Sequence, residues 1–194
     1  MLGSGLGKLI VISGPSGVGK TTLVKQLFQH CDKPLVASVS ATTRAPRANE
    51  TDGVDYYFLS PSEFLQRREQ GQFLECFEVF GRGYWYGTLL SEVEPRVNRG
   101  DWVLLEIDVQ GAQTVKSSHP DAVTIFVQPE SLEQLERRLR GRGTEPEDVI
   151  RRRLDVARHE MSIAKNYDYR VTNRTVDEAV AEICRILDRI GSST

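Results

Sequence analysis

Eight residues near the N-terminus constrain this chain more than any other feature. The segment Gly14-Pro-Ser-Gly-Val-Gly19-Lys20-Thr21 matches the pattern G-x-x-x-x-G-K-[ST]. The apolar run Leu9 to Ile12 before it predicts a buried strand, and the apolar spacing from Lys20 to His30 after it predicts a helix. In this context backbone N–H groups and the positive end of the helix converge on phosphate oxygens. An ordinary glycine-rich turn is the alternative, and Lys20, Thr21 and the context together disfavour it.

The residue types in the loop predict a nucleotide with a metal ion. Lys20 can reach the β and γ phosphates of ATP, and the Thr21 hydroxyl is placed for Mg²⁺. Asp108 follows the apolar run Val103 to Ile107, and a carboxylate at a strand end near such a loop handles the metal. Taken alone, Asp108 is as well explained as a turn residue. The predicted ATP-binding residues are Gly14, Pro15, Ser16, Gly17, Val18, Gly19, Lys20, Thr21 and Thr22; the predicted metal site is Thr21 with Asp108, for Mg²⁺ as cofactor.

The rest of the chain alternates strand and helix patterns, which predicts a three-layer α/β fold of the P-loop NTPase kind with a parallel central sheet. Apolar runs at Val103–Ile107 and Ala122–Val127 are typical of central parallel strands. Ser131 with Gln134 and Thr175 with Glu178 form capping boxes that begin two helices.

The stretch from Ser40 to Thr88 breaks this alternation. It is rich in turn residues, aromatics and short alternating runs, with one short helix expected from Ser60. We therefore expect core segments at residues 1–39, 91–140 and 161–194, an inserted β-rich flap at 40–90 and a helical lid at 141–160. Together they form one domain, because 194 residues support one substantial core.

Composition limits the partners. The net charge of -2 argues against bulk electrostatic binding of nucleic acid. The longest apolar run near the N-terminus is far shorter than the roughly 20 residues of a membrane span, so we expect no membrane contact and no export. Three cysteines without a C-x-x-C pair predict neither a disulfide framework nor a cysteine zinc site. The expected location is the cytoplasm, and the expected state is a monomer or small homo-oligomer.

Arginines gather in the C-terminal half of the chain. Of the 25 basic residues 19 are Arg, and eight of these lie between Arg137 and Arg158. Arginine grips phosphate oxygens in pairs, so this bias favours localised phosphate chemistry. Seven acidic residues between Glu133 and Glu160 support the alternative of a solvated helix. The two readings are evenly matched at this point.

A second set of segments resembles the guanylate kinase family. These are Ser40-Ala-Thr-Thr-Arg44-Ala-Pro-Arg47, Gly53-Val-Asp-Tyr56, Glu75, Tyr86-Gly-Thr88, Glu106-Ile-Asp108-Val-Gln-Gly111, Gly141-Arg-Gly-Thr144 and the segment around Arg153. With the glycine loop they cover nearly the whole chain in order. The resemblance implies a core, a GMP-binding flap and an ATP-side lid, and an enzyme that transfers the γ-phosphate of ATP to GMP or dGMP.

The resemblance also implies roles for individual residues. Arg44 and Arg47 would hold the GMP phosphate, with the hydroxyls of Tyr56 and Tyr86. The guanine readers would be Ser40, Glu75, Thr88 and Glu106. The residues around the transferring phosphoryl group would be Arg138, Arg142 and Arg153, which with Lys20 and Arg44 make up the expected catalytic set.

The chemistry of these residue types agrees with the implied roles. Guanine presents two donors, N1–H and the 2-amino group, beside the O6 acceptor, so Glu75 and Glu106 can accept and the hydroxyls of Ser40 and Thr88 can donate. No strong general base is needed for an anionic acceptor, because phosphoryl transfer depends mainly on positioning and charge neutralisation.

Several alternatives stay open. Arg44 and Arg47 can be surface charges, and Tyr56 and Tyr86 can be core aromatics. If Ile150, Leu154 and Ala157 form the buried face of the lid helix, periodicity excludes Arg152 but leaves Arg151, Arg153 and Arg158; only the resemblance selects Arg153. Three other functions also stay open for this chain. They are a catalytically inactive phosphopeptide-binding scaffold, a P-loop kinase for another phosphorylated acceptor such as a ribose bisphosphate, and a generic NTPase switch.

The chain departs from the family pattern at two places. Glu106 stands where the pattern has Asp, and its extra methylene implies a shifted guanine contact or a bridging water. The hairpin Gly81–Trp85 is two residues longer than usual, so Tyr84 stays open as a substitute for Tyr86.

Overall fold

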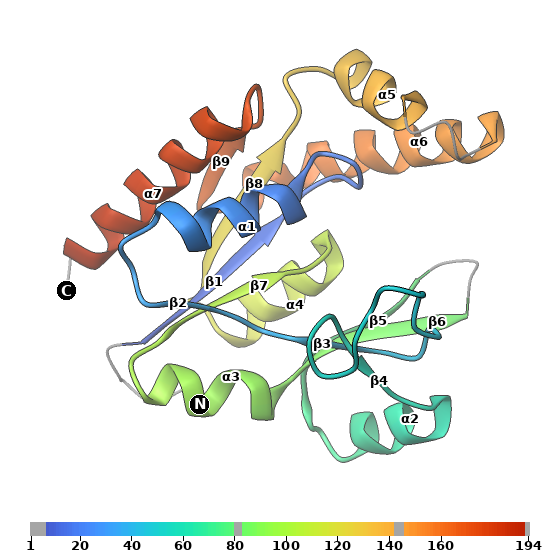
Figure 1. Cartoon of the computed structure of the whole chain (residues 1–194), viewed down its shortest axis with the longest axis vertical. Helices are drawn as coiled ribbons and strands as arrows, with labels where there is room; N and C mark the ends of the chain where they lie inside the picture. The colour runs from blue at the N-terminus through green and yellow to red at the C-terminus, as the bar shows by residue number, and fades with distance from the viewer. Residues whose placement is uncertain (1–6, 80–82, 142–145, 193–194) are drawn as a thin grey trace. The chain divides into compact units, whose positions relative to one another are not determined.

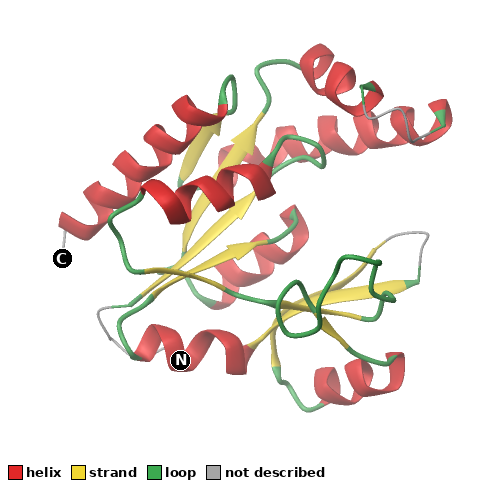
Figure 2. Cartoon of the chain, in the orientation of Figure 1, coloured by secondary structure: helices red, strands yellow, loops and turns green. Residues whose placement is uncertain are grey.

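The computed structural model describes residues 7–79, 83–141 and 146–192. The chain divides into two compact units, which we name by the feature each contains. The loop unit consists of Ile10–Leu35, Glu106–Val109 and Val123–Thr194, and the flap unit of Met1–Leu9, Val36–Leu105 and Gln110–Ala122. Figure 2 shows strands and helices alternating along much of the chain.

A five-stranded sheet has the order β2-β7-β1-β8-β9. Its strands are β1 (Lys8–Ser13), β2 (Leu35–Ala37), β7 (Trp102–Glu106), β8 (Val123–Gln128) and β9 (Tyr169–Thr172). The pairs β1–β8 and β8–β9 are parallel, with Ile12 opposite Ile125 and Val127 opposite Val171. These side chains are fully buried, which explains the continuous apolar runs in the sequence. The predicted α/β fold with a parallel central sheet is confirmed.

Three helices of the loop unit begin where the sequence predicts: α1 (Lys20–His30), α5 (Leu132–Arg140) and α7 (Val176–Ser192) (Figure 1). The unit also contains α6 (Glu147–Ile163) and the 3₁₀ turn η1 (Ala164–Asn166). The Ser131 hydroxyl accepts from the Gln134 N–H at 3.2 Å, and the Thr175 hydroxyl accepts from the Glu178 N–H at 3.3 Å. Each side chain satisfies one of the N–H groups that a helix start leaves without a partner.

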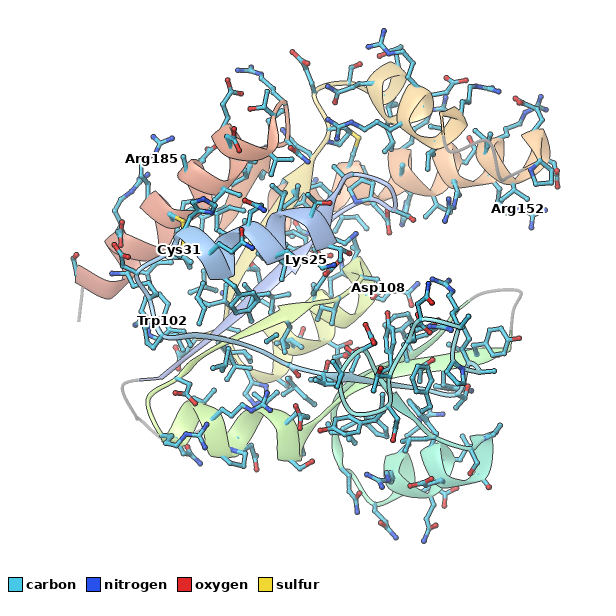
Figure 3. The ribbon with its side chains drawn as sticks, in the orientation of Figure 1. Lys25, Cys31, Trp102, Asp108, Arg152 and Arg185 are labelled. Carbon is cyan, nitrogen blue, oxygen red and sulfur yellow. A yellow bond between two sulfur atoms is a disulfide. The ribbon has the colours of Figure 1, made fainter. Side chains whose placement is uncertain are left out.

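The helices α5 and α6 pack on each other through one apolar cluster. Its buried members are Leu135, Leu139, Ile150, Leu154 and Ala157. The buried face expected for residues 150–157 is therefore confirmed, and Arg152 is exposed on α6 (Figure 3).

The flap unit contains a second, four-stranded sheet of order β4-β3-β6-β5. Its strands are β3 (Ser40–Thr42), β4 (Tyr57–Phe58), β5 (Phe73–Val79) and β6 (Tyr84–Leu89), and the unit also has helices α2 (Pro61–Glu69), α3 (Leu90–Asn98) and α4 (Val109–Ser118). The helix α2 is capped by Ser60, whose hydroxyl accepts from the Glu63 N–H at 3.2 Å. One face of this sheet is apolar: Ala41 and Leu89 form a cluster with Phe64 of α2.

A buried carboxylate joins several segments of the flap unit. Glu92 of α3 is 8% exposed and accepts from the Tyr57 hydroxyl at 2.7 Å. It also pairs with Arg96 at 3.1 Å, while Arg96 donates to the carbonyl of Ala37 at 2.7 Å. The network ties α3 to β4 and to the end of β2, so the chain entering β3 is fixed by charge-assisted hydrogen bonds.

Across the described parts of the chain, every helix falls short of the length and apolar character that membrane crossing requires.

The cysteines correct one expectation. Cys31, at the end of α1, is joined by a disulfide to Cys184 of α7, with the two Cα atoms 5.6 Å apart (Figure 3). The pairing spans 153 residues of sequence, so no local spacing could reveal it. It forms because α1 and α7 pack side by side, which brings the two cysteines within bonding reach.

We expect Cys184→Ser to lower the Tm by roughly 5–10 °C under non-reducing conditions, because a cross-link that closes a long loop restricts the unfolded chain. Differential scanning calorimetry with and without dithiothreitol measures this, and non-reducing mass spectrometry tests the bond itself. Cys76→Ser is the matched control, since Cys76 is the free cysteine of the described chain. Equal Tm values for wild type and Cys184→Ser without reductant would contradict the expectation.

Candidate functional site

The loop between β1 and α1 is packed against neighbouring backbone. Gly14 has φ of +145°, and a Cβ there would lie 2.0 Å from the carbonyl oxygen of Val127 in β8. No residue with a side chain fits this position, so the loop begins with glycine for a steric reason. Val18, in the middle of the loop, is fully buried.

Lys20 is held by the loop itself. Its ammonium donates to the carbonyl of Gly14 at 2.6 Å and to that of Pro15 at 3.3 Å. Burial lowers the pKa of Lys20, while the carboxylates of Glu106, Glu160 and Asp108 act in the opposite direction. Three acidic side chains of the loop unit thus act on Lys20, and each of them favours the charged form of the lysine.

Oxygen-bearing side chains lie at the start of α1 and at the end of β7. The Thr21 hydroxyl donates to Glu106 Oε1 at 2.7 Å, and Asp108 lies between β7 and α4 (Figure 3). No group of three or more His, Cys, Asp or Glu side chains suited to a metal ion occurs within the described ranges. Mg²⁺ usually takes one or two carboxylates together with phosphate and water oxygens, so Thr21 and these two carboxylates fit it.

The four-stranded sheet of the flap unit, called the flap sheet below, carries three of the predicted base readers in one row on its polar face. Ser40 of β3 pairs with Thr88 of β6, and Thr88 pairs with Glu75 of β5. Directly paired residues of adjacent strands project from the same face, so the three side chains are neighbours. Thr88 and Glu75 are buried, and the Thr88 hydroxyl donates to Glu75 Oε1 at 2.7 Å. The sheet register therefore brings together residues that are 48 positions apart in the chain.

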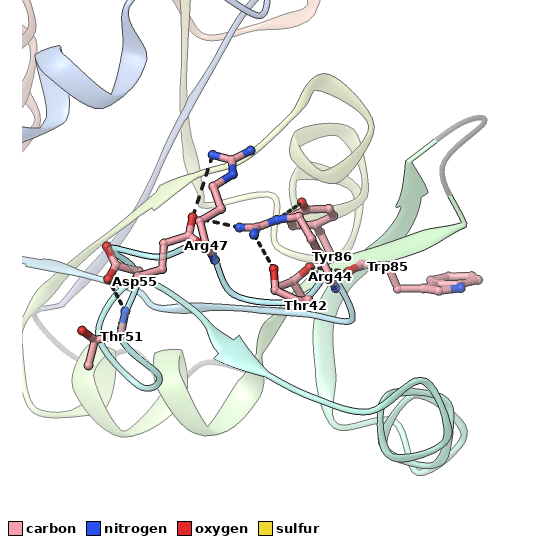
Figure 4. A network of polar contacts seen from close by, with 9 residues as sticks. Thr42, Arg44, Arg47, Thr51, Asp55, Trp85 and Tyr86 are labelled. Carbon is pink, nitrogen blue, oxygen red and sulfur yellow. Dashed lines mark hydrogen bonds and ion pairs between the residues drawn. The ribbon is translucent and has the colours of Figure 1, made fainter.

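The next part of the same face carries an arginine network (Figure 4). Arg44 donates from Nε to the Tyr86 hydroxyl at 3.1 Å and from Nη2 to Glu50 Oε1 at 2.9 Å. Its guanidinium also lies 5.4 Å from the centre of the Tyr56 ring. The backbone N–H of Arg47 and the Arg44 guanidinium lower the pKa of Glu50. Glu50 thus fixes the orientation of Arg44, a role that the sequence did not reveal.

The tyrosines and arginines of this network differ in how far they are exposed. Tyr86 contacts Arg44 and lies edge-on to Tyr56 at 5.9 Å between ring centres, whereas Tyr84 is 40% exposed. Arg47 has 74% of its side chain exposed and approaches Glu50 at 3.9 Å. Arg44 is therefore held in place by its neighbours, and Arg47 is the more accessible of the two arginines.

The candidate site thus has two parts, a glycine loop that holds Lys20 and a polar sheet face beside an oriented arginine. The family model described as Guanylate kinase matches residues 6–190. The chain belongs to the guanylate kinase family. A guanylate kinase of Rhodopirellula baltica is 56% identical over 93% of this chain and 87% of its own length, and one of Mycobacterium bovis is 46% identical over 94% and 87%.

Solved structures agree with this membership. The crystal structure of a guanylate kinase from Anaplasma phagocytophilum aligns with a TM-score of 0.78 at 34% identity, covering 96% of this chain and 87% of that one. A gluconokinase from Sinorhizobium meliloti aligns at 15% identity with a TM-score of 0.51, covering 96% and 94%, which shows likeness of fold alone. As a member of the guanylate kinase family the chain is a nucleoside monophosphate kinase, and the predicted enzyme class is confirmed.

The arginines that the family resemblance assigns to the phosphoryl group have different surroundings. Arg138 of α5 donates to the carbonyl of Val18 in the loop and to that of Asn173, both at 3.2 Å. Arg153 of α6 is half-buried. Arg142 lies outside the described residues. The structure thus brings Arg138 to the phosphate loop.

Asn173 is the residue of the loop unit that sequence reasoning missed. It follows β9 directly, is 2% exposed, and donates from Nδ2 to the Val18 carbonyl at 2.7 Å. A polar residue after a predicted strand is the signal that could have indicated it, as it did for Asp108. Nothing in the sequence placed that strand end beside the loop.

Glu160 of α6 has an unusual acidity. Burial raises the pKa of its carboxyl to about 7, with Lys20 lowering it and Asp108 raising it. Because this pKa lies above the ordinary value of 4.5, folding favours the protonated form. The corresponding stability is complete below about pH 4.5 and is lost as the pH rises through 7.

We expect Glu160→Gln to raise the Tm of the nucleotide-free protein at pH 8.5 and to leave it nearly unchanged at pH 4.5. The amide stays neutral, so the variant avoids the cost of a buried carboxylate at high pH. Thermal unfolding followed by circular dichroism at both pH values measures this, with Glu182→Gln on α7 as control. A gain of the same size at both pH values would show that packing, rather than ionisation, is responsible.

Proposed function

We propose that this member of the guanylate kinase family transfers the γ-phosphate of MgATP to GMP, and to dGMP, in a reversible reaction that gives ADP and GDP. The observation that carries the proposal is the row Ser40–Thr88–Glu75 on the polar face of the flap sheet, next to Arg44 and Tyr86. A base reader and a phosphate-binding arginine side by side are what a nucleoside monophosphate requires.

Guanine is the base that the row suits. A carboxylate at Glu75 would accept from N1–H and the 2-amino group, and the Ser40 hydroxyl would donate to O6. The Thr88 hydroxyl has a single O–H, so it would donate to O6 only in place of its bond to Glu75. Adenine would offer the buried Glu75 carboxylate no matching pair of donors, which costs much more than a missing apolar contact. Glu106 is the second proposed reader, and its bond to Thr21 also makes it a candidate for the metal side of the loop unit.

The phosphate of GMP would be bound by Arg44, Arg47 and the hydroxyls of Tyr56 and Tyr86. Arg44 supports this role because Tyr86 and Glu50 already fix its planar fork, so little side-chain freedom is lost on binding. Arg47, with 74% of its side chain exposed, supplies the accessible charge.

On the donor side, residues 14–22 would hold the phosphates of ATP, with Lys20 at the β and γ positions. Thr21 and Asp108 would hold Mg²⁺, which when bound would offset the charge of the phosphates. Arg138, Arg142 and Arg153 would neutralise charge that develops on the transferring group. The acceptor is already anionic, so positioning and charge neutralisation suffice without a strong base.

We place the enzyme in the cytoplasm, where its nucleotide substrates are made and used, as a monomer or small homo-oligomer. The net charge of -2 supports the absence of nucleic acid among its partners. Disulfides are rare in reducing compartments, so a Cys31–Cys184 bond found by non-reducing mass spectrometry in protein taken directly from cells would contradict this placement.

The proposed reaction is tested by ADP release from MgATP with GMP, dGMP, AMP, CMP and UMP as acceptors in a coupled assay. We expect turnover with GMP and dGMP and little with the others. Lys20→Ala should reduce kcat on the order of a hundredfold or more, because it removes a charge aimed at the transferring phosphate. Lys25→Ala, an exposed lysine on the same helix, is the control. Release of ADP that does not depend on the choice of acceptor would refute the proposal.

Glu75→Gln tests base reading. The amide offers one acceptor and adds donors that face the donors of guanine, so we expect the KM for GMP to rise about tenfold or more while the KM for MgATP changes little. Glu78→Gln is the matched control, since Glu78 is exposed on the same strand. If both variants showed the GMP kinetics of the wild type, the base would have to be read elsewhere.

A further inference from the structure

Asn173 lies behind the phosphate loop rather than in front of it. Its amide Nδ2 donates to the main-chain carbonyl of Val18 at 2.7 Å, and both residues are almost completely buried. The backbone N–H of Asn173 in turn donates to the carbonyl of Gln128, the last residue of β8, at 2.8 Å. The amide therefore links the loop to the ends of two core strands.

Arg138 completes the contact from the other side. Its Nη1 donates to the same Val18 carbonyl at 3.2 Å, and its Nη2 donates to the carbonyl of Asn173 at 3.2 Å. One carbonyl oxygen thus accepts two hydrogen bonds, one of them from a charged donor, and donors of this kind form the stronger bonds. The orientation of this peptide group is consequently specified by α5 and by the end of β9 together.

The orientation matters because the next group in the peptide plane is an N–H. No cis peptide bond occurs in the described chain, and in a trans peptide the C=O and the following N–H project in opposite directions. Holding the Val18 carbonyl toward Asn173 and Arg138 therefore directs the Gly19 N–H away from them. That N–H belongs to the group of loop amides that converge on phosphate.

Gly19 fits the same arrangement. Its φ is +100°, and a Cβ at this position would lie 2.9 Å from Asn173 Nδ2. The Asn173 side-chain amide thus lies directly against the Gly19 backbone. Both its volume and its hydrogen bond help to hold the Val18–Gly19 peptide.

We propose that Asn173 is a positioning residue for the phosphate donor: it fixes the Val18–Gly19 peptide so that the Gly19 N–H faces the phosphates of the bound nucleotide. The inference rests on the proposed function in that it needs a nucleotide in this loop. It does not depend on the identity of the acceptor or of the donor base, because the amide acts through the loop backbone.

The experiment compares Asn173→Leu, which keeps much of the volume without the donor, with Asn173→Ala. Titration calorimetry measures binding of MgADP and MgIDP, which share phosphates but differ in base, and the kinase assay gives the KM values for MgATP and GMP. Loss of one buried hydrogen bond to the loop should weaken the binding of MgADP and of MgIDP by the same factor, about five- to tenfold in Kd. The KM for MgATP should rise similarly, while the KM for GMP stays within about twofold.

Thr172→Val is the matched control. It removes the hydrogen bond from Gln128 Nε2 to the Thr172 hydroxyl at 3.1 Å, one residue away from Asn173, without touching Val18. Circular dichroism and Tm values show whether each variant is folded, and a variant that is not folded is replaced by the other of the pair.

Three outcomes overturn the inference. Unchanged nucleotide binding with a lowered Tm would mean that Asn173 only stabilises the core. Weaker binding of MgADP with unchanged binding of MgIDP would indicate that Asn173 contacts the adenine base directly. Equal losses for GMP and for MgATP would indicate a general distortion. The proposed function fails separately, if the wild type releases no ADP in response to GMP, and the calorimetry remains valid in that case.

Discussion

The candidate site depends on holding the backbone of one loop in a fixed conformation. Residues 14–21 can bind phosphate only if their N–H groups converge, and so their carbonyl groups must find partners on the other side. Gly14 packs on the Val127 carbonyl of β8, the Val18 carbonyl accepts from Asn173 and Arg138, and Lys20 binds the carbonyl of Gly14. The parallel strands and α5 thus contribute to the site through backbone contacts, and changes at these elements should alter nucleotide binding without any contact with the nucleotide.

The elements that were predictable from the sequence are those specified by local chemistry. The helix Lys20–His30 follows from apolar spacing, and the caps at Ser60, Ser131 and Thr175 follow from short polar motifs. The apolar strands of the central sheet are equally local signals. The disulfide, the Thr21–Glu106 bond and the Asn173–Val18 bond were not predictable, because each joins residues that only the packing of distant segments brings together.

The candidate site shows the same division. Family resemblance named Ser40, Glu75 and Thr88, but only strand register explains why they lie together, since β3 and β5 both pair with β6 at Thr88. Likewise Arg44 stood out as a phosphate ligand, whereas Glu50, which orients it, is an ordinary surface acid in the sequence. Residues that touch a ligand carry a chemical signature, and residues that position them often do not.

The Glu75–Thr88 pair adds a physical argument about selectivity. A carboxylate 3% exposed is costly in a folded protein unless donors surround it, and the fully buried Thr88 hydroxyl supplies one of them at 2.7 Å. The two groups are already desolvated in the folded chain, so much of that cost is met by folding rather than by binding. If Glu75 reads the base as we propose, a guanine with two donors would gain hydrogen bonds at low additional cost, while a base that presents acceptors there would meet a carboxylate that cannot turn to water. On this proposal, discrimination at this face would arise from the register of three strands, which buries the pair before any nucleotide arrives.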